Sequence, residues 1–153
     1  MGRAIVCGVD GKQHSEAAVR LADALAHELD LPLVFAHVID GGESEVDLRR
    51  VRQATEAAAP DAYATWVVQT GHPVDQLVSI AEEWRAAFLV VGSHGPRSSL
   101  LGSVSAEVSR RASSAVVVVP RDHELAQERP EKKLLASAGG IARFNLGGGR
   151  GQR

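Results

Sequence analysis

Five short apolar runs alternate along the chain with longer segments that carry regularly spaced apolar residues. The runs, which we interpret as strands buried in a sheet, cover residues 3–9, 32–39, 62–69, 86–92 and 115–120. The segments between them, which we interpret as helices, cover residues 15–29, 45–59, 74–84 and 103–112. Because strand and helix alternate throughout, the pattern predicts an α/β fold, a five-stranded parallel sheet with helices on both faces.

Individual residues mark the ends and the buried faces of these helices. Ser15 is the expected N-cap of the first helix, with Glu16 favourable in its first turn. Pro60 ends the second helix, and Pro73 lies near the first position of the third, where a missing N–H is tolerated. The predicted buried face of the first helix comprises Ala18, Leu21, Ala22, Leu25 and Leu29.

Composition and charge restrict the setting in which such a fold works. The chain has 153 residues, enough for one domain with a core, and only 4% of them are aromatic, so aliphatic residues must build that core. A net charge of −2 predicts no specific nucleic-acid partner. We expect a cytoplasmic protein, because Cys7 is a lone thiol inside an apolar run and neither a signal peptide nor a membrane span is visible.

The end of the chain differs in character from the rest, which predicts a domain at residues 1–122 and a tail at residues 123–153. Residues 133–153 contain basic but no acidic side chains and end in GGGRGQR. Such a segment buries too little surface to offset the entropy lost on ordering, which favours a flexible tail. The alternative is a weak electrostatic tether to RNA, an anionic partner or a membrane surface.

A glycine- and serine-rich loop, GSHGPRSSLLGS, follows the fourth predicted strand at residues 92–103. Ligands of open parallel sheets bind beyond the carboxyl ends of the strands, where this loop is expected. Exposed N–H groups in such a loop, together with the start of the helix at Gly102 and Ser103, favour a phosphate. A turn that merely joins strand to helix explains the glycine spacing equally well.

The order of motifs along residues 3–120 resembles the universal stress protein family. The resemblance rests on AIVCGVDGKQHSEAAVRLA, LVFAHVID, TGHPVDQLVSIAEE and VVGSHG…LLGSVSAEVSRRASSAVVVVP. It implies a Rossmann-like three-layer sandwich of the adenine nucleotide alpha-hydrolase-like type. Many members bind ATP or another adenine nucleotide through G-x2-G-x9-G-[ST]. If a metal takes part, Mg²⁺ held mainly by the phosphates is the natural species.

Residue by residue, the resemblance implies a nucleotide site at the carboxyl edge of the sheet. Asp10 matches the carboxylate beside the adenosine end of the nucleotide, and Val38 matches the apolar contact near adenine. The full implied site comprises Val9, Asp10, Val38, Gly92, His94, Gly95, Gly102, Ser103 and Val104.

The glycine motif departs from the family pattern in its length. Gly92 and Gly95 match the first two glycines, and Gly102 with Ser103 matches the final pair. Only PRSSLL separates Gly95 from Gly102, which is three residues shorter than the family spacing. Pro96 removes one more N–H from this loop. We therefore expect the loop to hold fewer phosphates and to prefer ATP little over ADP or AMP.

Other chemically versatile side chains are interpreted without a catalytic or metal-binding role. Those expected near the same sheet edge are Lys12, His37, Asp40 and His94. Lys12 is expected to be a solvated lysine of a turn, and no HxxxH or CxxC spacing predicts a protein metal site. Trp66 and Trp84 are expected to be packing residues. No catalytic residue is predicted, because Cys7 lies within a strand and no Ser-His-Asp arrangement is suggested.

Two functions remain open at this point. The first is a regulatory module of the stress response that binds an adenine nucleotide and at most hydrolyses it slowly; Asp10 and the glycine motif favour it. The alternative, which the shortened loop favours, is a nucleotide-independent interaction protein that acts as a dimer. In either case the fifth strand is expected at a sheet edge, where pairing with a second copy makes a homodimer. The centre of that interface is predicted at Val116, Val117, Val118 and Val119.

Overall fold

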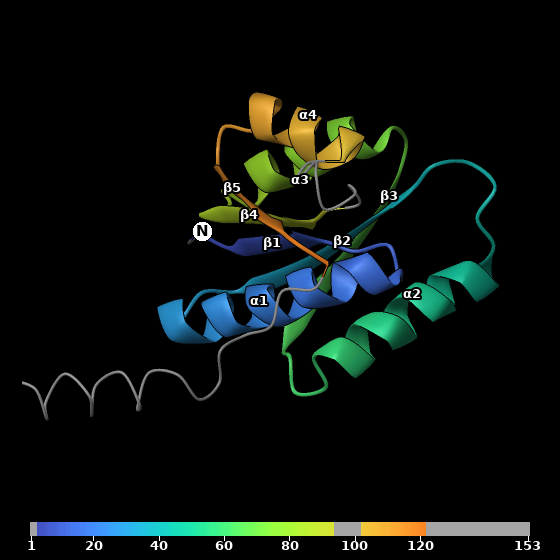
Figure 1. Cartoon of the computed structure of the whole chain (residues 1–153), viewed down its shortest axis with the longest axis horizontal. Helices are drawn as coiled ribbons and strands as arrows, with labels where there is room; N and C mark the ends of the chain where they lie inside the picture. Colours follow the sequence, from blue (N-terminus) through green and yellow to red (C-terminus); the bar gives the residue numbers. More distant parts are fainter. Residues whose placement is uncertain (1–2, 94–101, 122–153) are drawn as a thin grey trace, which may run out of the picture. The chain divides into compact units, whose positions relative to one another are not determined.

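Strands and helices alternate along the chain (Figure 1), and the computed structural model describes residues 3–93 and 102–121. The strands are β1 (Ile5–Gly8), β2 (Leu33–Ile39), β3 (Ala64–Thr70), β4 (Phe88–Gly92) and β5 (Ala115–Val119). The helices are α1 (Gln13–Leu29), α2 (Glu45–Ala58), α3 (Pro73–Glu83) and α4 (Ser103–Arg111). The predicted alternation is therefore confirmed, with boundaries that move by at most two residues.

All five strands form one parallel sheet in the order β3-β2-β1-β4-β5. The central strand is β1, whose Ile5 pairs with Leu33 of β2 on one side and with Phe88 of β4 on the other. The prediction that β5 lies at an edge is confirmed, and β3 forms the opposite edge. The strand order reverses between β1 and β4, and such a switch point is where open α/β sheets bind ligands.

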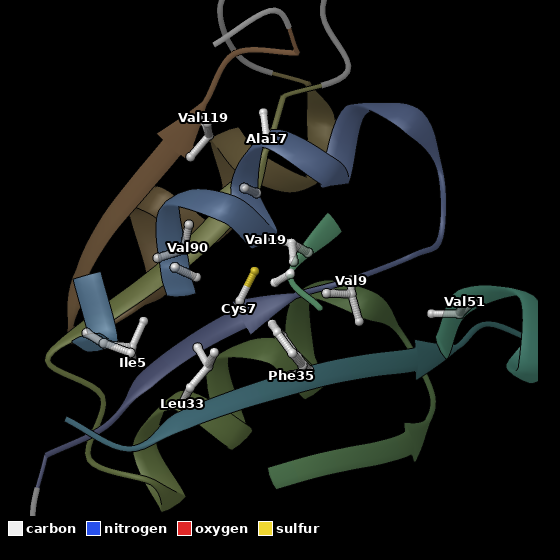
Figure 2. Close-up of a cluster of buried hydrophobic side chains, with 14 residues drawn as sticks. Ile5, Cys7, Val9, Ala17, Val19, Leu33, Phe35, Val51, Val90 and Val119 are labelled. Atoms are coloured by element: carbon white, nitrogen blue, oxygen red, sulfur yellow. The ribbon is translucent and has the colours of Figure 1, made fainter. Parts of the chain in front are cut away.

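Helices cover both faces of the sheet, with α1 and α2 on one side and α3 and α4 on the other (Figure 1). Side chains of β1 alternate between the two layers: Ile5 and Cys7 pack toward α1 (Figure 2), and Val6 packs toward α3 and α4. Burial on both faces explains why β1 is a continuous apolar run. Burial also raises the pKa of the Cys7 thiol, in keeping with its prediction as a core residue.

Local signals place the starts of the helices. Ser44 and Asp47 form a reciprocal capping box at α2, in which the Ser44 side chain accepts from the Asp47 N–H and the Asp47 side chain accepts from the Ser44 N–H. Pro73 occupies the start of α3, as predicted. Gly102 is the N-cap of α4.

The predictions for α1 are wrong in two details. The helix begins at Gln13, so Ser15 lies inside its first turn, buried, and its hydroxyl donates to the Lys12 carbonyl oxygen at 2.9 Å. Lys12 is the N-cap residue, and its side chain makes no capping hydrogen bond. Leu29, predicted on the buried face, is 47% exposed, because Ala26 makes the core contact in the last turn.

The remaining expectations about single residues divide into two groups. Trp66 packs against Phe35, with ring centroids 5.3 Å apart, and Trp84 packs against the cluster on the α3 side, so the packing roles are confirmed. His94, Gly95, the rest of the shortened loop and the predicted tail at 123–153 lie outside the described residues.

None of helices α1 to α4, which are those of the described residues, is long and apolar enough to span a bilayer.

Candidate functional site

A pocket of about 280 Å³ lies where β1, β2 and β4 end, at the switch point of the sheet. It is lined by Gly8, Val9, Asp10, Lys12, His14, Ser15, Ala36, Val38, Asp40, Pro73, Leu77, Val91, Gly92 and Val104. Three structural layers therefore contribute: the strand ends, the first turn of α1, and the starts of α3 and α4. Such a concave site, largely apolar with a few polar groups, is typical of small-molecule binding.

The turn between β1 and α1 brings Asp10 to this pocket. Gly11 has a φ of +72°, and a Cβ on it would lie 2.8 Å from the Cα of Val51 in α2. Only glycine satisfies both conditions, because other residues disfavour this φ and α2 leaves no room for a side chain. The turn is therefore tight, and Asp10 and Lys12 both lie at the pocket.

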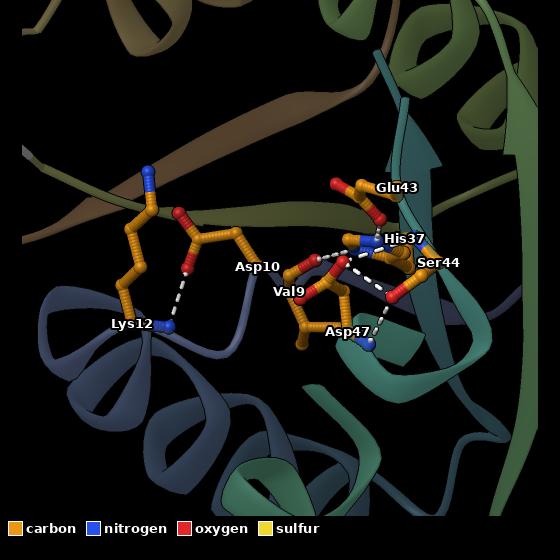
Figure 3. Close-up of polar contacts among 7 residues, drawn as sticks. All are labelled: Val9, Asp10, Lys12, His37, Glu43, Ser44 and Asp47. Atoms are coloured by element: carbon orange, nitrogen blue, oxygen red, sulfur yellow. Dashed lines mark hydrogen bonds and ion pairs between the residues drawn. The ribbon is translucent and has the colours of Figure 1, made fainter. Parts of the chain in front are cut away.

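Hydrogen bonds from the first turn of α1 and the residue before it hold the Asp10 carboxylate in place. Its Oδ1 accepts from the backbone N–H of Lys12 at 3.0 Å (Figure 3), and its Oδ2 lies 2.7 Å from Nε2 of His14. Because a carboxylate only accepts hydrogen bonds, the imidazole Nε2 is the donor in the second contact. Burial acts to raise the pKa of Asp10, but the Lys12 N–H, the charge and hydrogen bond of His14 and the Ser15 hydroxyl together lower it.

Gly92 ends β4 directly against the first turn of α1. A Cβ at this position would lie 2.5 Å from the carbonyl oxygen of His14, closer than real Cβ atoms come to backbone. A side chain here would push α1 away from β4. The packing of α1 against β4 therefore requires glycine at position 92, whether or not a phosphate binds nearby.

The structure brings five of the nine predicted site residues to the pocket: Val9, Asp10, Val38, Gly92 and Val104. The side chain of Val9 packs in the core on the α1 side, and its N–H donates to the Ala36 carbonyl oxygen. Gly102 and Ser103 do not line the pocket but directly precede Val104 at the start of α4. His94 and Gly95 lie outside the described residues.

The suggested convergence of His37 and Asp40 with Asp10 is half right. Asp40 lines the pocket. The ring of His37 is buried and points toward the Val9 carbonyl oxygen and Glu43 instead (Figure 3). Its Nδ1 donates to the Val9 carbonyl oxygen at 2.7 Å, and its Nε2 lies 2.7 Å from Oε2 of Glu43. Within residues 3–93 and 102–121, no three His, Cys, Asp or Glu side chains form a group that could hold a metal ion.

The pocket also contains residues outside the nine predicted site residues. Lys12 is exposed, as expected, but it also lines the pocket. His14 follows Asp10 by four residues, and this i, i+4 spacing at the start of a helix was the available signal. Pro73 and Leu77 of α3 had no such signal, because only the folding of α3 over the sheet brings them to the strand ends.

Known proteins resemble this chain in sequence and in fold. A family model for the universal stress protein family matches residues 1–120. Two universal stress proteins of Mycobacterium tuberculosis are each 52% identical to this chain over 52 residues. The match spans 32% of this chain and 36% of each relative. The chain therefore aligns with only about a third of the length of these curated relatives.

Solved structures extend the likeness to about three quarters of the chain. A universal stress protein in complex with cAMP is 28% identical, covers 76% of this chain and 96% of its own, and has a TM-score of 0.59. A universal stress protein from Archaeoglobus fulgidus in complex with dAMP is 24% identical, with 76% and 97% coverage and a TM-score of 0.59, and shows the same fold. Sequence, topology and the family model agree, and the chain belongs to the universal stress protein family.

Proposed function

We propose that this chain is a regulatory module of the stress response that binds an adenine nucleotide in the pocket between β1, β2 and β4. The observation that carries the proposal is the meeting of Asp10, Val38, Gly92 and Val104 around one cavity at the switch point of the sheet. The relative in complex with cAMP, 28% identical, supports an adenine ligand.

Each part of the pocket has a distinct role in this proposal. Val38 and Val104, which are partly buried, supply apolar contacts for the base. The Asp10 carboxylate, ionised because its pKa is lowered, accepts hydrogen bonds from the sugar hydroxyls. The N–H groups at the start of α4, behind Gly102, face the phosphate with the positive end of the helix dipole.

The proposed ligands are ATP, ADP, AMP or cAMP, with Mg²⁺ bound mainly through the phosphates of the longer nucleotides. We expect ATP to bind less than about tenfold more tightly than AMP, because the shortened loop offers fewer N–H donors to the outer phosphates. The module is proposed to be non-enzymatic, with hydrolysis at most slow, and to act in the cytoplasm.

Calorimetric titration of nucleotide-stripped protein with ATP, ADP, AMP and cAMP tests the proposal. Gly102→Val should abolish binding and leave the fold intact, because the added side chain obstructs the first N–H groups of α4. Ser109→Val, at an exposed position of the same helix, is the matched control and should bind as the parent does. If no adenine nucleotide binds the parent, the nucleotide-independent interaction protein becomes the better account.

We further propose a homodimer that pairs β5 with β5 of a second copy. The edge position of β5 supports it, since an unpaired apolar edge is prone to association. The side chain of Val119 is only 1% exposed and packs toward α1, so backbone pairing, rather than this side chain, would join the two copies. Sedimentation equilibrium at micromolar concentration should give twice the mass of the chain; a monomer contradicts the proposal.

A further inference from the structure

The outer edge of β3 is open to pairing with another strand. Edge strands of natural sheets are usually kept from pairing by being short, by charges or proline, or by a bulge. Within the described residues β3 pairs only with β2, and its seven residues, ATWVVQT, include neither a charge nor a proline. The ladder runs unbroken from Leu33 with Ala64 to Ile39 with Thr70, so this strand has no bulge either.

The backbone groups that β3 presents at its outer edge follow from the ladder with β2. The N–H of Gly71 donates to the Ile39 carbonyl oxygen in β2. Because successive residues of a strand alternate in direction, positions 65, 67 and 69 turn their N–H and C=O groups toward β2. Positions 64, 66, 68 and 70 turn theirs outward. Trp66 and Val68 therefore offer donors and acceptors at the centre of the edge.

A small hollow of about 70 Å³ lies beside this edge, on the face of the sheet that carries α2. The Val68 side chain, which is 43% exposed, forms part of its wall. An added strand turns every second side chain to this face, so one of its apolar side chains can lie over the hollow. The hollow is lined by His37, Leu48, Val51, Arg52, Trp66 and Val68.

Two arginines of α2 give this surface a positive charge. Arg49 and Arg52 are exposed and line a second hollow with Glu45 and Leu48; both hollows share Leu48 and Arg52. The Arg52 guanidinium lies 4.9 Å from the centroid of the Trp66 ring. In the part of the chain that the structure describes, neither arginine forms an ion pair with a carboxylate. Acidic side chains on an incoming strand would supply these partners.

We propose that the β3 edge binds an extended peptide segment of another protein, whose side chains on the α2 face alternate between acidic and apolar. The proposal goes beyond the nucleotide site, since β3 contributes no residue to that pocket. A second copy of this chain fits the edge less well. Antiparallel pairing of two β3 strands puts both α2 helices on one face of the joined sheet, so the arginines of both copies lie on that same face.

The probe is the peptide acetyl-TETVTET-amide, titrated into the ¹⁵N-labelled full chain and followed by NMR. Its sequence reads the same in both directions, so parallel and antiparallel pairing both place Glu, Val and Glu on one face. At saturation, amide exchange of Trp66 and Val68 should slow at least about fivefold, because their N–H groups point outward. Exchange of Val67 and Gln69, which point toward β2, should change less than about twofold.

The backbone and the charge are tested separately. Val68→Pro removes one outward N–H, which an edge strand tolerates, and should abolish the slowing at Trp66. The double variant Arg49→Gln, Arg52→Gln should weaken peptide binding about three- to tenfold, the effect of two partly exposed ion pairs. Arg50→Gln is the matched control, because Arg50 lies on the same helix and lines neither hollow. Circular dichroism confirms that each variant is folded.

The peptide acetyl-TKTVTKT-amide decides the sign of the charge. Binding at least about fivefold weaker than that of the acidic peptide supports the proposal, together with losses in the proline and double-arginine variants only. Equal binding of the two peptides, or no binding of either up to about 1 mM, overturns it.

Exchange and mass of the parent without peptide distinguish other occupants of the edge. Slow exchange at both Trp66 and Val68 in the parent alone means that the edge is already covered, which overturns the proposal. If, in addition, sedimentation equilibrium shows that Val68→Pro lowers the mass of the assembly, the occupant is a second copy.

Discussion

Two histidine–carboxylate pairs in this molecule have the same nitrogen–oxygen distance of 2.7 Å and different surroundings. In the pair of His14 with Asp10, four residues apart, the side chains are 14% and 33% exposed, and both residues line the pocket. In the pair of His37 with Glu43, the imidazole is 4% exposed and its second nitrogen donates to the Val9 carbonyl oxygen. The distance alone therefore does not say what a pair does.

The difference lies in which elements each pair connects. His37 joins β2, the end of β1 and the segment before α2, so both of its nitrogens are used inside the fold (Figure 3). His14 contacts Asp10 from within one turn of the chain, and both residues line the pocket. We conclude that the buried pair connects separate elements of the fold, whereas the pocket pair lies where the nucleotide is proposed to bind.

Replacing His37 should produce the largest effect on stability. His37→Leu removes the donor to the Val9 carbonyl oxygen and leaves Glu43 without its partner, so we expect a loss of about 2–4 kcal/mol in the free energy of unfolding. His14→Leu, the matched change in the pocket pair, should cost less than about 1 kcal/mol. Urea denaturation of both variants measures the difference, and equal losses would remove the distinction between the pairs.

A methyl group on Gly92 tests whether the pocket pair depends on the packing of α1 against β4. Gly92→Ala places a Cβ against the His14 backbone carbonyl, so we expect about 1–3 kcal/mol of destabilisation and weaker cAMP binding. The control is Gly8→Ala at the end of β1, where the nearest atom is the Leu77 side-chain tip at 3.3 Å, which can move. A cost at Gly92 no larger than the cost at Gly8 contradicts the argument.

The sequence predicts the type and order of the helices and strands of the described residues, because the residues of both core layers form regular apolar patterns along the chain. The alternation of Ile5 and Cys7 with Val6 produces the apolar run, and Pro73 marks the start of α3. The start of α1 was misplaced since Ser15 is a preferred capping residue, whereas the N-cap is Lys12, whose side chain makes no capping hydrogen bond.

The candidate site was predicted where neighbours in sequence form it and missed where the fold forms it. Asp10 was identified because it follows a buried strand directly. Leu77 of α3 reaches the pocket only through tertiary packing, which no spacing reveals. The role of Gly92 was predicted as phosphate binding, but its contact with His14 requires knowing that α1 starts beside the end of β4.

Removing the charge of Asp10 should have a smaller effect on stability that appears on the acid side. Its pKa is lowered in the folded state, so its contribution is present above the unfolded pKa of about 3.9 and is lost as pH falls through the folded value. Asp10→Asn should therefore be less stable than the parent near neutral pH and should lose less stability on acidification. Unfolding curves between about pH 2 and 6 test this, and parallel acid-side slopes contradict it.

The smallest effect is expected from Glu43→Gln, which keeps the shape of the buried pair and removes its charge. The Glu43 side chain is 30% exposed, so water screens its interaction with the imidazole, and the glutamine amide still offers an oxygen to His37. We expect less than about 1 kcal/mol of destabilisation and, since Glu43 does not line the pocket, the same cAMP affinity as in the parent. If Glu43→Gln weakens cAMP binding while His14→Gln leaves it unchanged, the roles given to the two pairs must be exchanged.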